Sequence, residues 1–209
     1  MRSVRFTVLA PAVALTALAG GALAFAPQGA ADAPRAATSR TGGSTRGDAG
    51  TAQWERELKA ALPTLGHRNW IVVADSAYPQ QSSPGVKTIV TGAHQVDVVK
   101  DVTALLDRQA HVKAHVQVDK ELAFVPEKSA PGITAYRKDL DKALAGQETV
   151  PVLHNDLIAK LDAAGEKFNV IVLKTDLTLP YTSVFFELDA KYWDADREAD
   201  LRERMEQGR

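Results

Sequence analysis

Cysteine is absent from this chain of 209 residues, and the absence excludes several kinds of chemistry. The protein has no disulfide bridge, no thiolate nucleophile and no cysteine zinc site, and it lacks the residue to which a lipoprotein's lipid is attached. An exported protein without disulfides is more typical of bacteria than of eukaryotic secretion.

An excess of basic charge is missing as well, because the formal net charge is -1 at pH 7. Nucleic acid and anionic membrane surfaces both select a basic stripe, so neither is expected as a partner. Hydrophobic residues make up 45% of the chain and charged residues 24%, which is a normal globular composition. The chain is therefore expected to form one domain with its own core.

The N-terminus has the form of a secretory signal peptide. Arg2 and Arg5 precede an apolar stretch at 6–26, which ends in small residues that suit a signal peptidase. The alternative is an uncleaved membrane anchor, because about twenty apolar residues can span a bilayer. We expect residues 1–26 to be cleaved on export, leaving no stable membrane association, and residues 27–50, rich in small and polar residues, to be a disordered linker.

Residues 51–193 are expected to form the folded domain, followed by a charged helical tail at 194–209. Apolar spacing predicts helices at 51–65, 96–106, 133–144 and 156–164, and strands at 70–74, 87–91, 112–118, 150–153 and 168–173. Strands that alternate with helices predict an α/β fold of three layers, with a mixed central sheet flanked by helices.

The short apolar run Trp70–Ala74 reads as a buried strand with a polar residue at each end. His67 follows a predicted helix end at Gly66, and Asp75 follows the strand. Ligands of open α/β sheets lie outside the carboxyl ends of the strands, so Asp75 is a candidate site residue. It either caps a turn or accepts a hydrogen bond in a cleft. Imidazole titrates near neutrality, at a pKa of ~6.5, which makes His67 a candidate acid/base.

Two later junctions carry further candidates. His154 lies between a short apolar run and a helix. Tyr181 and Ser183 follow a buried strand and place two hydroxyls on one face if their segment is extended, although Tyr181 also suits a core-edge position with its hydroxyl in water. His111 and His115 share one face of a predicted strand without a carboxylate at ligand spacing, so no metal site is expected there, and no cofactor is expected elsewhere.

These residues resemble the signatures of the RbsD/FucU family, which comprises D-ribose pyranase and L-fucose mutarotase. The first signature is Leu-Gly-His at 65–67, a strand that ends in Asp75, and Pro79 four residues on. His154 before a helix resembles the family's second histidine. Pro-Tyr-Thr-Ser at 180–183 is similar to the family's Pro-Tyr-x-Asn, with Ser183 in place of asparagine. The resemblance covers roughly 58–188 in order.

The resemblance implies that His67 transfers protons, that Asp75 is its polar partner, and that His154 and the segment containing Tyr181 and Ser183 form a sugar-binding wall. It also implies ring-like homo-oligomers, commonly decamers, with sites between neighbouring subunits. Serine lacks the amide that gives two directed donors. Family members act in the cytoplasm, whereas this chain is expected to be exported.

We therefore expect a mutarotase or pyranase-like isomerase that interconverts ring or anomeric forms of a free monosaccharide by acid/base catalysis. The alternative is an exported, non-catalytic protein of the same fold that binds a monosaccharide or another small ligand. A third interpretation is a structural oligomer whose polar residues only cap helices and strands.

Overall fold

The computed structural model of this protein describes residues 46–208, with side chains from residue 53 onward. The predicted signal peptide at 1–26 and most of the predicted linker at 27–50 lie outside the described residues, although a helix already begins at Arg46. Within the described range, no helix is both long enough and apolar enough to cross a membrane.

The predicted helices and strands are present in the predicted order, and the structure adds a strand at Val184–Ala190 that the apolar spacing did not predict. In chain order they are α1 (Arg46–Ala61), the 3-10 helix η1 (Leu62–Thr64), β1 (Trp70–Ala74), β2 (Val86–Val90), α2 (Gln95–Asp107), β3 (Val112–Asp119), the 3-10 helix η2 (Lys120–Phe124), α3 (Ile133–Ala143), β4 (Thr149–Val152), α4 (His154–Gly165), β5 (Val170–Lys174), β6 (Val184–Ala190) and α5 (Ala195–Glu206).

Two predicted boundaries are wrong for identifiable reasons. The first helix was expected to run to Leu65 but ends at Ala61, because Pro63 cannot donate to the helical ladder and the chain tightens into η1. The fourth helix was expected from Asp156 but already includes His154, whose backbone N–H is capped by the carboxylate of Glu121. A carboxylate at a helix N-terminus stabilises the first turn.

The sheet has six strands in the order β2-β5-β1-β6-β3-β4. β1 is parallel to β5, β5 to β2, and β3 to β4, whereas β6 runs antiparallel to both β1 and β3. The predicted mixed sheet is therefore confirmed. β6 brings its N-terminal end to the edge at which the other five strands have their carboxyl ends.

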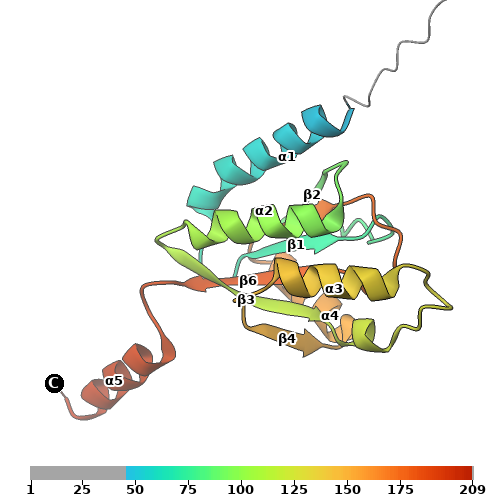
Figure 1. The fold of residues 1–209 in the computed structure, drawn as a ribbon. Helices are drawn as coiled ribbons and strands as arrows, with labels where there is room; N and C mark the ends of the chain where they lie inside the picture. The colour runs from blue at the N-terminus through green and yellow to red at the C-terminus, as the bar shows by residue number, and fades with distance from the viewer. Residues whose placement is uncertain (1–45, 209) are drawn as a thin grey trace, which may run out of the picture. The chain divides into compact units, whose positions relative to one another are not determined.

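Helices cover both faces of this sheet, which confirms the three layers. Figure 1 shows α2 and α3 in front of the sheet and α4 behind it. Along β1, Ile71 and Val73 pack in one core with Trp54 of α1, whereas Val72 packs in the other core with Leu157 of α4. Side chains alternate across a strand with a period of two, so one buried strand supplies both cores.

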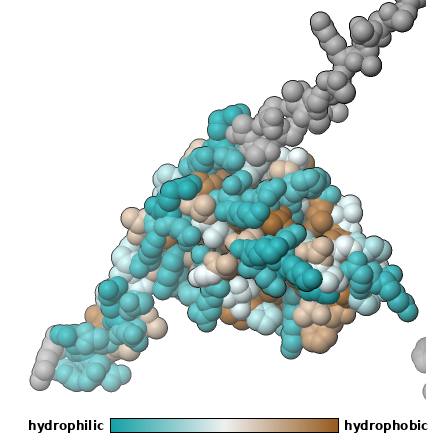
Figure 2. All heavy atoms as spheres, viewed as in Figure 1, coloured by the Kyte–Doolittle hydropathy of each residue, from teal (hydrophilic) through white to brown (hydrophobic). Residues whose placement is uncertain are grey.

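The outer surface is mostly polar on the face drawn in Figure 2, with smaller apolar areas that include the lower edge, where Figure 1 places β4. Val150 of β4 and Leu153 just after it are 47% and 49% exposed. β4 is an edge strand, and Pro151 interrupts its row of backbone donors. A proline on an edge strand limits pairing with other strands.

Candidate active site

Several polar side chains converge at the carboxyl edge of the sheet. Asp75 follows β1, Asp119 is the last residue of β3, and His154 is the first residue of α4, separated from β4 by one residue. Tyr181 and Ser183 precede β6, whose Val184 pairs with Val73 of β1 and Val118 of β3. The strand order therefore gathers four of the five predicted site residues at one edge, together with Asp119.

The closest contact in this cluster joins His154 to Asp119, which the sequence analysis did not single out. His154 Nδ1 lies 2.9 Å from Asp119 Oδ1, and the Asp119 side chain is fully buried. Burial raises the pKa of Asp119 to about 6, and the hydrogen bond from His154 opposes this rise. The negative charges of Glu121 and Asp75 add to the rise. This carboxyl group therefore titrates close to neutrality, as acid/base chemistry requires.

His154 also contacts Tyr181. The two rings meet edge to face, with centroids 5.5 Å apart, and Tyr181 is 41% exposed. This arrangement is a favourable geometry for two aromatic rings. It places the phenol and the imidazole side by side at a surface that a small polar ligand can reach.

The segment of Tyr181 and Ser183 is not extended, so the condition under which their hydroxyls would share one face is not met. Tyr181 has a left-handed backbone with a φ of 56°, so the chain turns before β6 begins. Ser183 is only 1% exposed, and its hydroxyl has no hydrogen-bond partner among the described residues. Within one chain, Tyr181 is open to a ligand and Ser183 is covered.

A buried polar network supports this turn. The carbonyl of Thr182 accepts hydrogen bonds from the Tyr136 hydroxyl, at 2.6 Å, and from the Gln95 side chain. Gln95 also donates to the Tyr136 oxygen at 3.0 Å and accepts from Thr175 at 2.9 Å. Burial raises the pKa of Tyr136, so its hydroxyl stays neutral and continues to donate. Because these side chains satisfy one another, the strained backbone of Tyr181 is held in place.

The position of Asp75 is compatible with both predicted roles, a turn cap and a hydrogen-bond acceptor in a cleft. Its Oδ1 accepts the backbone N–H of Ala77 at 2.9 Å, which is a turn-capping bond. Its charge also acts on the cluster, because Asp75 contributes to the raised pKa of the buried Tyr78, after burial itself, Asp162 and Asp119. Asp75 therefore caps a turn while it belongs to the electrostatic environment of the site.

His67 lies at the opposite edge of the sheet. It precedes β1, whereas Asp75 follows it, and the five residues of β1 span roughly 13 Å at about 3.3 Å per step. A single chain therefore does not bring His67 to the cluster of Asp75, His154 and Tyr181.

A carboxylate and a second histidine surround His67 at that edge. His67 Nδ1 lies 2.6 Å from Asp189 Oδ1, and His115 Nε2 lies 3.3 Å from Asp189 Oδ2. Arg68 Nε donates to His67 Nε2 at 3.1 Å. A carboxylate only accepts and a guanidinium only donates, so His67 carries its proton on Nδ1 and presents a lone pair on Nε2. His67 is therefore held in the tautomer in which Nε2 is the base.

The histidine pair at 111 and 115 does not share a ligand position. His111 Nε2 lies 3.2 Å and 3.1 Å from the carbonyl oxygens of Leu62 and Leu65, whereas His115 contacts Asp189. Among residues 46–208, no group of three or more histidine or carboxylate side chains is arranged to hold a metal ion.

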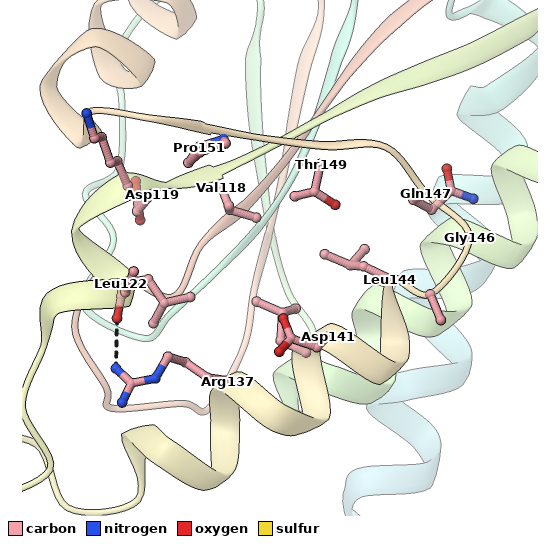
Figure 3. A pocket seen from close by; sticks show the side chains of 14 residues that line it. Val118, Asp119, Leu122, Arg137, Asp141, Leu144, Gly146, Gln147, Thr149 and Pro151 are labelled. Carbon is pink, nitrogen blue, oxygen red and sulfur yellow. Dashed lines mark hydrogen bonds between the residues drawn. The ribbon is translucent and has the colours of Figure 1, made fainter.

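A groove of about 520 Å³ lies near the same edge, between α3 and the β3–β4 pair. Figure 3 shows Asp119 at one end of it and Leu144 with Gln147 toward the other, while Arg137 donates to the carbonyl of Leu122. Aliphatic and polar side chains both line the groove, and Asp119 is the one lining residue that also belongs to the polar cluster.

The position of Asp119 in the sequence could have indicated it as a site residue. Asp119 directly follows the predicted strand at 112–118, just as Asp75 follows the strand at 70–74. Asp189 offered no such signal, because it lies within β6 and its partners are 122 and 74 residues away along the chain.

A model of the RbsD / FucU transport protein family matches residues 51–188, and no match is found among curated proteins. Similar solved structures include Bacillus subtilis RbsD complexed with D-ribose and a Streptococcus pneumoniae fucose mutarotase in complex with L-fucose. Each is 20% identical, covers 64% of this chain and 91% of its own, and has a TM-score of 0.44. FucU from Bifidobacterium longum is 13% identical over 64% of this chain and 94% of its own, with a TM-score of 0.41. Because the family model spans more than half of the sequence, the chain belongs to the RbsD/FucU family.

Proposed function

We propose that this protein is a mutarotase or pyranase-like isomerase that interconverts ring or anomeric forms of a free monosaccharide. The observation that carries the proposal is the joint position of His154, Tyr181 and Asp75 at the carboxyl edge of the sheet, in a chain of the RbsD/FucU family. Imidazole, phenol and carboxylate supply the donors and acceptors that a sugar's hydroxyl groups need.

The reaction requires only proton transfer. A base takes the proton of the anomeric hydroxyl, the bond between the anomeric carbon and the ring oxygen breaks, and an acid protonates the ring oxygen. After rotation about the adjacent carbon–carbon bond, the same steps run in reverse. A rate gain of a few thousandfold corresponds to ~4 to 5 kcal/mol and is within reach of positioned acid/base groups.

We propose that His67 joins this site from a neighbouring subunit. Within one chain, His67 and Asp75 lie beyond opposite ends of β1, so a site that uses both is formed where the two edges of different copies meet. A homo-oligomer, such as the decamer that the family resemblance implies, provides such a contact. In this arrangement Nε2 of His67 is the proton-transfer atom, and Arg68 moves off it when a sugar binds.

Subunit complementation tests the shared site. The rate of anomer exchange of ribose and fucose is measured by saturation-transfer NMR for the wild type, for His67→Ala, for Asp75→Asn, and for the two variants co-expressed with different tags. Each variant alone is expected to be slow. The mixed oligomer is expected to regain about one quarter of the wild-type rate, because random assembly pairs an intact His67 with an intact Asp75 at about one site in four.

Other results select the alternatives. Accelerated exchange that survives His67→Ala contradicts the proposed role of His67, and a mixed oligomer without regained activity contradicts the shared site. A wild-type protein that binds ribose or fucose without accelerating exchange is the non-catalytic binding protein. An oligomer of about ten subunits with no sugar affinity is a structural assembly.

We also propose that the protein is exported. Arg2, Arg5 and the apolar stretch at 6–26 support this proposal. Sequencing the N-terminus of the protein recovered outside the cytoplasm tests it, because cleavage leaves a mature chain that begins near residue 27, whereas an uncleaved anchor retains residue 1.

A further inference from the structure

Asp119 is a buried carboxylate whose position the proposed reaction does not yet explain. Its side chain is fully buried, and Oδ2 has no hydrogen-bond partner among the described residues. Its Oδ1 contacts the ring of His154 at 2.9 Å. Burying a carboxylate that is only partly satisfied costs free energy, so the contact with His154 needs a reason beyond stability.

Capping of α4 is not that reason. The backbone N–H of His154, at the start of α4, is bound by the carboxylate of Glu121, with both oxygens at 3.1 Å. Among the described residues, the Asp119 carboxylate shares a hydrogen bond only with the imidazole of His154, so its effect falls on the chemistry of that ring.

The contact determines which nitrogen of His154 can act as a base. An ionised carboxylate accepts hydrogen bonds only, so Nδ1 carries the proton and Nε2 keeps its lone pair. The His154 side chain is 29% exposed and lies edge to face with Tyr181, so the ring is partly open on the side of the proposed sugar site.

We propose that Asp119 is a positioning residue that holds His154 in the tautomer with a free Nε2, and that this nitrogen is the second acid/base group of the sugar site. This inference rests on the proposed isomerase function. Ring opening needs one group that takes a proton from the anomeric hydroxyl and another that gives a proton to the ring oxygen. The free Nε2 of His154 takes the anomeric proton, and His67 of the neighbouring subunit, when protonated on both ring nitrogens, gives a proton to the ring oxygen. Closing the ring returns both protons and restores both groups.

The surroundings of the pair are acidic. The groups that act on Asp119 are His154, Glu121 of η2 and Asp75 after β1, so two carboxylates and one imidazole face it. Tyr78 and Tyr136 lie within electrostatic range, and burial raises the pKa of both phenols, so they stay neutral. Asp119 itself has a pKa of about 6, so above that pH it is the ionised acceptor that the Nδ1 proton requires.

The experiment compares wild type, Asp119→Asn and the matched control Glu121→Gln as full chains. The tautomer of His154 is read from the ¹⁵N shifts of its imidazole, and anomer exchange of ribose and fucose is measured from pH 5 to 8. In the wild type we expect the Nδ1–H tautomer. In Asp119→Asn the amide can donate to Nδ1, so we expect a shift to the Nε2–H tautomer.

The rate should follow the tautomer. In Asp119→Asn we expect kcat to fall by at least about tenfold with little change in KM, and the rate change near pH 6 to disappear. In Glu121→Gln we expect the wild-type tautomer and a rate above pH 7 within about twofold of the wild type, with the rate change displaced to lower pH because the charge of Glu121 adds to the raised pKa of Asp119. In a His154→Gln background, Asp119→Asn should have no further effect on the rate, because Asp119 acts through His154.

Three outcomes overturn the inference, and they are distinguishable. An unchanged His154 tautomer in Asp119→Asn removes the positioning role whatever the sugar. A changed tautomer with an undiminished rate, in an active wild type, removes the catalytic role of His154 and leaves the isomerase function intact. A wild type that does not accelerate exchange removes the proposed function, and the inference falls with it.

Discussion

Replacing Asp119 by asparagine should make the protein's stability less dependent on pH. Asp119 has an ordinary pKa of 3.8, and burial raises it to about 6 in the folded chain. Between these values the folded state binds a proton that the unfolded state has released, so the folded state loses relative stability as the pH rises. Asparagine occupies nearly the same volume and has no proton to lose.

The magnitude follows from the size of the pKa shift. A pKa raised from 3.8 to about 6 corresponds to about 3 kcal/mol of unfolding free energy, which the wild type keeps below pH 4 and has fully lost above pH 7. The wild type should therefore lose about 3 kcal/mol relative to Asp119→Asn between pH 4 and pH 7. In a His154→Gln background the loss should be larger, because the hydrogen bond that lowers the pKa of Asp119 is gone.

Urea unfolding followed by tryptophan fluorescence measures this difference, since Trp54 and Trp70 are buried in the two cores. The curves are recorded from pH 4 to pH 8 at one protein concentration, because an oligomer's apparent stability depends on concentration. Titratable groups that behave in the same way in the wild type and in Asp119→Asn do not contribute to the difference between the two unfolding free energies. If the two stability profiles run parallel, or if the variant becomes the less stable protein as the pH rises, the assignment of a buried, high-pKa carboxyl to Asp119 is refuted.

Three further substitutions test the buried polar network, the core, and the edge of the sheet at which His67 lies. Tyr136→Phe removes one hydrogen bond from each of two buried partners, the Gln95 side chain and the Thr182 carbonyl, and should cost about 1–3 kcal/mol of unfolding free energy, measured in urea; a cost below that range means that water replaces the hydroxyl. Phe185→Ala empties a fully buried site in the core beneath α4 and should cost about 3–5 kcal/mol, and a much smaller loss in the same assay shows that the core collapses into the space. Asp189→Asn should change stability by less than about 1 kcal/mol, because its ion pairs are exposed, yet release the Nδ1–H tautomer of His67 in ¹⁵N spectra; a retained tautomer contradicts the assigned contact.

Local patterns were sufficient for the architecture. The run Trp70–Ala74 is apolar at every position, and such a run of five residues is a strand buried on both faces, which is what β1 is. The alternation of strands with helices predicted three layers, because helices that connect parallel strands cover the faces of the sheet. The mixed sheet was predicted as well, but β6, the antiparallel strand that makes it mixed, was not.

Contacts between distant segments were beyond those patterns. Asp189 meets His67 because β6 runs antiparallel to β1, so the end of one strand lies beside the start of the other. The turn at Tyr181 was equally hidden. Tyr181 keeps its left-handed backbone because buried side chains donate hydrogen bonds to the carbonyl of the next residue, Thr182. The composition of the segment itself does not indicate that network.

The sequence by itself determined the candidate residues His67, Asp75, His154 and Tyr181. Each lies at a junction between a strand and a helix or turn, and the loops at such junctions commonly carry binding and catalytic residues. Only the tertiary structure decided which of them meet. The direction of each strand places a residue at one edge of the sheet or the other, and the direction is set by pairing between strands that are far apart in sequence. For that physical reason His154 joined Tyr181 and Asp119 at the carboxyl edge, while His67 went to the opposite edge with Asp189.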